Sequence, residues 1–119
     1  MPATLPTASG GPLMPVSVKA VAIRHGAVLL GENERDEWEL LGGRPEPGEP
    51  FEAALVREVQ EEAGASVAVG RRVVDEPFEV LPCRFVRIVA FRCELLDPDG
   101  VRPSSEHRAV RLVPLDELS

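Results

Sequence analysis

The chain has 119 residues and a formal net charge of −7, and 44% of its residues are hydrophobic. This length predicts one domain that can bury a core without disulfide bonds. The acidic balance argues against binding to the backbone of duplex nucleic acid, which needs a basic face, but it allows a phosphorylated substrate if metal ions supply positive charge.

The sequence predicts neither a membrane protein nor a secreted one. No apolar run approaches the roughly 20 residues of a membrane span, and the first residues lack the charged and apolar blocks of a signal peptide. Cys83 and Cys93 form neither a Cys-x-x-Cys pair nor a dense cysteine framework. We therefore expect reduced thiols and a cytoplasmic location.

The predicted domain follows a proline-rich start. Residues 1–15 contain four prolines, two glycines and no charged side chain, which predicts a flexible tail before one domain at 16–119. In chain order, we predict strands at 16–24, 27–30 and 38–41, a helix at 51–63, strands at 67–74, 78–81, 85–95 and 109–113, and the opening of a second helix at 114–118. His25-Gly26 predicts a tight hairpin, and Gly64 should end the first helix. The order indicates a mixed α/β fold and not a regular βαβ repeat.

The predicted helix carries Glu58, Glu61 and Glu62, at positions i, i+3 and i+4. At about 100° per residue, these carboxylates share one arc of the helix with the small Ala54. The adjoining arc is apolar and is predicted to face the sheet; it consists of Leu55, Val56, Val59 and Ala63. We call this predicted element the carboxylate helix.

A solvated acidic face is the ordinary interpretation of such a cluster, and two features count against it. Glu58 and Glu62 repel each other at i, i+4 by roughly 0.2–0.5 kcal/mol, and the helix has no lysine to offset this. The charges also lie in the C-terminal half, where the helix dipole disfavours them. A bound cation would relieve both costs, and ligands made only of oxygen favour Mg²⁺, or Mn²⁺ as a substitute, over Zn²⁺.

Four further residues belong to this region. Arg57 could hold a carboxylate such as Glu49 in a bidentate contact, although a surface ion pair is the simpler role. Gly42-Gly43 ends a strand, and glycine there would also let a ligand or metal approach the backbone closely.

Together these residues form a pattern that resembles the signature of the Nudix hydrolases, G-x5-E-x7-R-E-U-x-E-E-x-G-U, where U is a bulky aliphatic residue. The matching residues are Gly43, Glu49, Arg57, Glu58, Val59, Glu61, Glu62 and Gly64. The final position is Ala65, which is smaller than usual, and Leu41 stands where many members have proline. Neither departure removes a charged group. The strand order also resembles a Nudix domain from about Val16 to the C-terminus.

The resemblance implies an α/β/α sandwich around a mixed sheet. The carboxylate helix would cover one face, but the second outer helix is short or missing, because few residues follow Leu115. An uncovered apolar face is a liability. We therefore expect either that a partner subunit covers it, as in a homodimer, or that the chain is shortened, with impaired activity.

The resemblance also implies Mg²⁺-dependent hydrolysis of a nucleoside diphosphate linked to another moiety, with a nucleoside triphosphate or an ADP-ribose-like molecule as the small-molecule substrate. Glu58 and Glu62 would be the principal metal ligands, and Glu61 a further ligand, directly or through water. Glu49 would bind metal or orient the network, and the Gly42 carbonyl is a candidate ligand.

Other candidate residues lie partly outside the helix. Family members place the general base differently; Glu106, just before the last strand, is one candidate, with an ordinary loop carboxylate as the alternative. Gly43 and Phe78 are the predicted substrate contacts, by close backbone approach and by base stacking. Structural roles are expected for the rest, in the core for Trp38 and Phe51 and on the surface for His25 and His107.

Two other functions remain open. One is a catalytically silent Nudix-like domain that senses a nucleotide and regulates a partner, although such domains usually lose carboxylates that this chain keeps. The other is an acidic α/β interaction domain without a metal site. Metal binding separates the interaction domain from the other two, and turnover separates enzyme from sensor.

Overall fold

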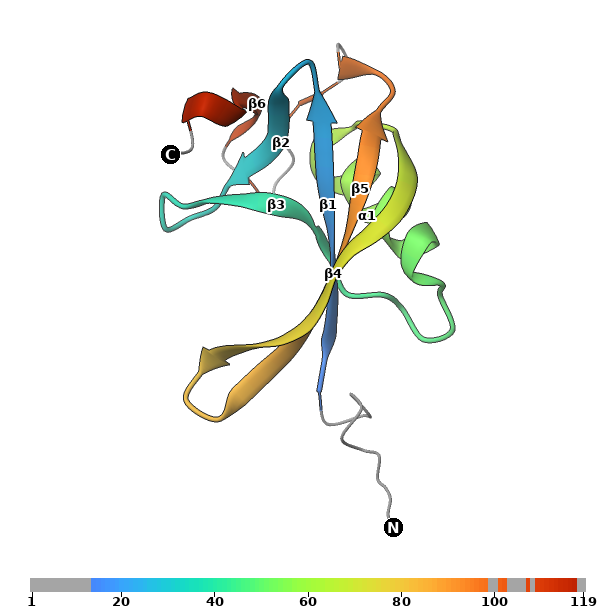
Figure 1. Ribbon diagram of the computed structural model, residues 1–119, viewed down its shortest axis with the longest axis vertical. Helices are drawn as coiled ribbons and strands as arrows, with labels where there is room; N and C mark the ends of the chain where they lie inside the picture. The colour runs from blue at the N-terminus through green and yellow to red at the C-terminus, as the bar shows by residue number, and fades with distance from the viewer. Residues whose placement is uncertain (1–13, 99–100, 103–106, 108, 118–119) are drawn as a thin grey trace.

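The computed structural model describes residues 14–98, 101–102, 107 and 109–117. Most of the predicted tail, residues 1–13, lies outside them. The elements are β1 (Val16–Arg24), β2 (Ala27–Glu32), β3 (Trp38–Gly43), α1 (Phe51–Ala63), β4 (Val67–Leu81), β5 (Arg84–Leu95), β6 (Ala109–Pro114) and the short 3-10 helix η2 (Leu115–Glu117) (Figure 1). This order confirms the predicted α/β class.

All six strands belong to one mixed sheet, in the order β4-β5-β1-β3-β2-β6. Strand β1 runs parallel to β5, and the other neighbours are antiparallel. Val18 lies opposite Val89 of β5 on one side and opposite Gly43 of β3 on the other. The predicted hairpin between β1 and β2 is present, with positive φ angles at His25 (51°) and Gly26 (77°).

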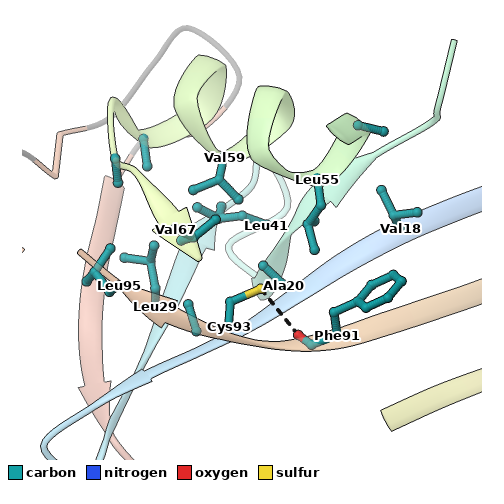
Figure 2. Close-up of a cluster of buried hydrophobic side chains, with 14 of the residues drawn as sticks. Val18, Ala20, Leu29, Leu41, Leu55, Val59, Val67, Phe91, Cys93 and Leu95 are labelled. Atoms are coloured by element: carbon teal, nitrogen blue, oxygen red, sulfur yellow. Dashed lines mark hydrogen bonds between the residues drawn. The ribbon is translucent and has the colours of Figure 1, made fainter. Parts of the chain in front are cut away.

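The main core lies between α1 and one face of this sheet. Figure 2 shows Leu55 and Val59 projecting from the helix toward Leu41 and the neighbouring strands, and both side chains are fully buried. Burying each such side chain contributes about 1.5–3 kcal/mol to stability. The sheet-facing side of α1 is therefore its main attachment to the rest of the fold.

One part of the predicted helix orientation is wrong. Val56, expected to face the sheet, is 42% exposed, whereas Ala54, expected among the carboxylates, is fully buried. The buried arc is rotated toward the glutamates because Glu62 itself points inward, where the backbone of β3 supplies a hydrogen-bond donor.

Both ends of α1 agree with the prediction. Pro50 precedes the helix with an extended backbone (φ −61°, ψ 149°), and no side chain caps the first turn. Gly64 ends the helix in the left-handed region, with φ 63°, and its N–H donates to the Gln60 carbonyl at 2.9 Å. Glycine adopts this conformation without the penalty that other residues incur.

Strands predicted separately at 67–74 and 78–81 form one continuous strand, β4, with β-bulges or register shifts along it. The break expected near Pro77 does not occur, because β4 is the edge strand and proline is tolerated there. The hairpin of β4 and β5 extends away from the main body (Figure 1).

The sheet face opposite α1 carries a smaller cluster of Val28, Leu30 and Val113, with Ile23 and Leu40 packed against it. Within the described residues, the chain after β6 forms only η2, which agrees with a short second helix. None of the described helices is long and apolar enough to cross a membrane.

The two aromatic residues expected in the core differ. Phe51 is half-buried and packs against the main core. The core prediction for Trp38 is wrong, because its ring is exposed at the start of β3 with the Arg111 guanidinium 5.4 Å from its centroid. An arginine over an exposed indole replaces the packing that a core position would supply.

We expect Leu55→Ala to lower the free energy of unfolding by about 2–5 kcal/mol, because it leaves a cavity between α1 and the sheet. Val56→Ala, on the exposed side of the same turn, should cost less than about 1 kcal/mol. Urea denaturation followed by circular dichroism measures both. Equal losses would contradict the assignment of the buried face.

Candidate functional site

Arg57 is the centre of the charged cluster on α1. Its Nε donates to Oε2 of Glu49 and its Nη2 to Oε1, both at 2.9 Å. This is the bidentate geometry in which guanidinium–carboxylate pairs are strongest. The contact expected between these two residues is therefore present.

The same guanidinium also reaches two carboxylates of the helix. Nη1 of Arg57 lies 3.1 Å from Oε2 of Glu58 and 3.2 Å from Oε1 of Glu61. Glu49 and Glu58 are largely buried, while Glu61 is exposed. One cation thus gathers three of the predicted metal-site carboxylates.

A tight turn before α1 places Glu49. The Glu49 N–H donates to the Glu46 carbonyl, and the Glu46 N–H donates to Oε1 of Glu49, each at 2.9 Å. Gly48, with φ 79°, supplies the left-handed residue of this turn. The carboxylate is therefore held from its own loop as well as from the helix.

These bonds control the ionisation of the pair. Hydrogen bonds from Arg57, followed by the one from the Glu46 N–H, lower the pKa of Glu49 from 4.5 to about 2. The hydrogen bond with Glu49 is in turn the main cause of the raised pKa of Arg57. Both groups are charged throughout the neutral range.

Glu62 is placed differently, against the end of β3. It is only 4% exposed, and its Oε1 accepts the Gly42 N–H at 2.9 Å. Gly42 has φ 151°, and a Cβ atom there would lie 1.9 Å from the Val18 carbonyl oxygen. Only glycine fits at this point, so the backbone that holds Glu62 depends on it.

Gly43 allows the second close approach. A Cβ atom on Gly43 would lie 2.6 Å from Cδ of Glu58. The Glu58 carboxylate therefore occupies the space that a side chain at Gly43 would fill. The two glycines together bring Glu58 and Glu62 against one short stretch of backbone.

The chemistry of these donors fits a hard divalent cation, since carboxylate oxygens from adjacent turns are the ligands that Mg²⁺ prefers. Their arrangement is the one adopted with arginine as the cation. Across the described residues, no three His, Cys, Asp or Glu side chains already stand in an arrangement that could hold a metal ion. We expect Glu58 and Glu61 to turn away from Arg57 when a metal binds.

Of the predicted site residues that the structure describes, Phe78 is not brought to this cluster. Glu106 lies outside the described residues. Phe78 is 46% exposed and pairs with Val86 in the distal part of the β4–β5 hairpin, which extends away from the body (Figure 1).

The surface role expected for His107 is wrong. His107 is only 7% exposed, its Nε2 lies 2.9 Å from Oε2 of Glu39, and a Cβ atom on Gly31 would lie 2.6 Å from its ring. Burial disfavours the charged form of Glu39, but hydrogen bonds from His107 and Asn33 outweigh it and lower the pKa of Glu39. The glycine in an otherwise apolar strand was the sequence signal for this contact.

A further charged group, not predicted from the sequence, lies at the base of the β4–β5 hairpin. Asp75 bonds the guanidinium groups of Arg72 and Arg87, and both guanidiniums lie over the ring of Phe51. The group joins α1, β4 and β5, so no local spacing indicates the contact.

We expect the Glu49 carboxyl to titrate near pH 2, and to return toward 4.5 in Arg57→Gln. Because the folded-state pKa is lowered, the stability gained from ionised Glu49 is complete above about pH 4.5 and is lost as the pH falls toward 2. Side-chain ¹³C NMR measures the midpoint. Arg35→Gln removes an exposed arginine elsewhere and should leave the Glu49 midpoint unchanged. A shift of that midpoint in Arg35→Gln would show that net charge, and not the contact with Arg57, lowers the pKa.

Comparison with known proteins agrees with this geometry. Residues 14–119 match the family model described as NUDIX domain. "CTP pyrophosphohydrolase" of Escherichia coli is 35% identical over 98 residues, which cover 78% of this chain and 70% of the relative. "Putative 8-oxo-dGTP diphosphatase 2" of Mycobacterium tuberculosis is 34% identical over 111 residues, covering 87% and 75%.

The fold agrees as well. A crystal structure of a NUDIX hydrolase from Nitrosomonas europaea superposes with a TM-score of 0.77 at 30% identity, with 88% of this chain and 60% of that chain covered. This chain thus spans about three fifths of that solved hydrolase. The family match over nearly the whole described chain, and the shared fold, show that this protein belongs to the Nudix family.

Proposed function

We propose that this chain is a Mg²⁺-dependent Nudix pyrophosphohydrolase that cleaves a diphosphate linking a nucleoside to another moiety. The observation that carries the proposal is the convergence of Glu49, Glu58 and Glu61 on Arg57, beside Glu62 at the backbone of Gly42. Such a concentration of carboxylates is costly without a cation, and its place in the family signature supports a metal site.

Each residue then has a specific task. Glu58 and Glu62 would hold the metal, with Glu61 and the Gly42 carbonyl as further ligands. A bound divalent cation supplies charge neutralisation for the diphosphate and a more acidic water. The Gly42 N–H orients Glu62, and Arg57 keeps Glu49 ionised and in place.

Glu106 is our proposal for the general base. It is one residue from His107, which is anchored in the sheet by Glu39. A loop carboxylate takes a proton from the attacking water only if it comes within hydrogen-bond reach of it. Replacing Glu106 with glutamine should therefore reduce kcat and leave metal affinity unchanged.

For the substrate, we propose a nucleoside triphosphate. The support is the naming of two relatives for CTP and 8-oxo-dGTP. An ADP-ribose-like molecule is the alternative. Gly43 is the proposed backbone contact and Phe78 the proposed stacking group. A cytoplasmic location, and a homodimer that sedimentation velocity would detect, also stay predictions.

The alternative function is that of a domain that binds a nucleotide without cleaving it. The retention of Glu49, Glu58, Glu61 and Glu62 favours the enzyme. A phosphate-release screen with Mg²⁺ and with Mn²⁺, over nucleoside triphosphates, ADP-ribose, dinucleoside polyphosphates and sugar nucleotides, decides between them. Binding without release would identify a sensor.

We expect Glu58→Gln and Glu62→Gln each to weaken Mn²⁺ binding and to lower kcat by on the order of 10²-fold or more, because each removes a proposed ligand. Calorimetric titration and phosphate release measure the two effects. Glu52→Gln is the matched control, since Glu52 is exposed in the first turn of the same helix. An unchanged metal affinity in both site variants would rule out the proposed metal site.

A further inference from the structure

A cationic clasp lies beside the first turn of α1, outside the carboxylate cluster. Oδ1 of Asp75 accepts Nε of Arg87 at 2.7 Å, and Oδ2 accepts Nη2 of Arg87 and Nη1 of Arg72, both at 2.8 Å. One carboxylate therefore fixes two guanidinium groups. We call Arg72, Asp75 and Arg87 the arginine clasp.

An aromatic platform fixes the clasp a second time. The guanidinium carbons of Arg72 and Arg87 lie 5.4 and 5.5 Å from the centroid of Phe51, within cation–π range. Arg72 is also 5.4 Å from the centroid of Phe91. Both arginines remain partly exposed. They are pre-organised cations that solvent, or a ligand, can reach.

The clasp lies against Phe51, which is on the same helical stripe as the proposed metal ligand Glu58. Phe51 precedes Glu58 by seven residues. In an α-helix this is a rotation about 20° short of two full turns and a rise of about 10 Å along the axis, so the two side chains leave the same side of the helix. Arg72 pairs with Phe91, whose ring belongs to the core beneath α1, so the clasp is on the helix-covered face of the sheet. A ligand lying along this stripe would meet carboxylates at one end and arginines at the other.

The clasp has more positive charge and more N–H donors than its bonds to Asp75 use. Two guanidiniums against one carboxylate leave one net positive charge, in a chain whose net charge is −7. The bonds to Asp75 use three guanidinium nitrogens and leave Nη1 of Arg87, and Nε and Nη2 of Arg72, outside them. Planar N–H donors of this kind match phosphate oxygens.

We propose that the arginine clasp binds a phosphate group of the substrate that lies beyond the cleaved anhydride, such as the terminal phosphate of a nucleoside triphosphate. This inference rests on the proposed function and sharpens it. A triphosphate tail places a charged group along the stripe, whereas ADP-ribose places a neutral sugar beyond its diphosphate. The clasp therefore selects for the length of the phosphate chain.

The test compares two substrates in one variant. We expect Arg72→Gln to lower kcat/KM for CTP by about 10- to 100-fold, the range for a lost hydrogen bond to a charged group. The value for ADP-ribose should stay within about twofold. Arg72→Lys should recover much of the loss, because an ammonium group still binds phosphate as a point charge.

Arg71→Gln is the matched control, because it removes the same charge from the neighbouring exposed residue, which makes no bond in the clasp. It should leave both substrates unchanged. Equal losses on CTP and ADP-ribose in Arg72→Gln, or no loss on either, would overturn the inference, and thermal melting would show whether lost folding is the cause.

A binding experiment separates this inference from the proposed hydrolysis. If no substrate is turned over, the proposed function fails, and calorimetry with inorganic tripolyphosphate still tests the clasp. Binding to the wild-type chain that weakens about tenfold or more in Arg72→Gln supports the clasp. Equal affinities, or no binding to the wild type, overturn it.

Discussion

The constraint on which this structure depends is the repulsion among carboxylates within two turns of one helix. Glu58, Glu61 and Glu62 lie on neighbouring positions, and Glu49 is brought beside them by its own loop. Arg57 pairs with three of these carboxylates, and a backbone N–H donates to the fourth. The helix can carry so much negative charge only because every carboxylate has a donor and a cation is always near.

The packing of these carboxylates in turn restricts which residues can stand at the end of β3. Strand β3 ends in two glycines, and Glu58 occupies the space that a side chain at Gly43 would fill. The close pairing of β3 with β1 at Val18 leaves no room for a Cβ atom at Gly42 either. Gly42 is thus required by the packing of β3 against β1, and Gly43 by the carboxylate of Glu58. The buried side of α1 holds the helix, and with it these carboxylates, against β3.

The features of the structure that were predictable from sequence are the local ones. The spacing of Glu58, Glu61 and Glu62 follows from helix geometry alone, and Gly64 is a local stop signal. Gly31 was a local sign that a side chain packs against its strand, but the contact of His107 with Glu39 was not predictable, because it joins residues 68 positions apart. The same holds for the continuous β4, where position at the edge of the sheet, and not local propensity, decides that a proline is tolerated.

The division between local and distant contacts also separates the family signature from the residues to which we assign selectivity by proposal. The signature residues sit on one helix and its preceding loop, so their geometry can be retained while the rest of the chain changes. The arginine clasp is built from β4 and β5 and contacts the helix through Phe51. If the clasp binds phosphate as we propose, a change in the hairpin would alter which phosphate chain is bound without replacing Glu58 or Glu62, whereas a change in Phe51 would remove the ring over which both clasp arginines lie.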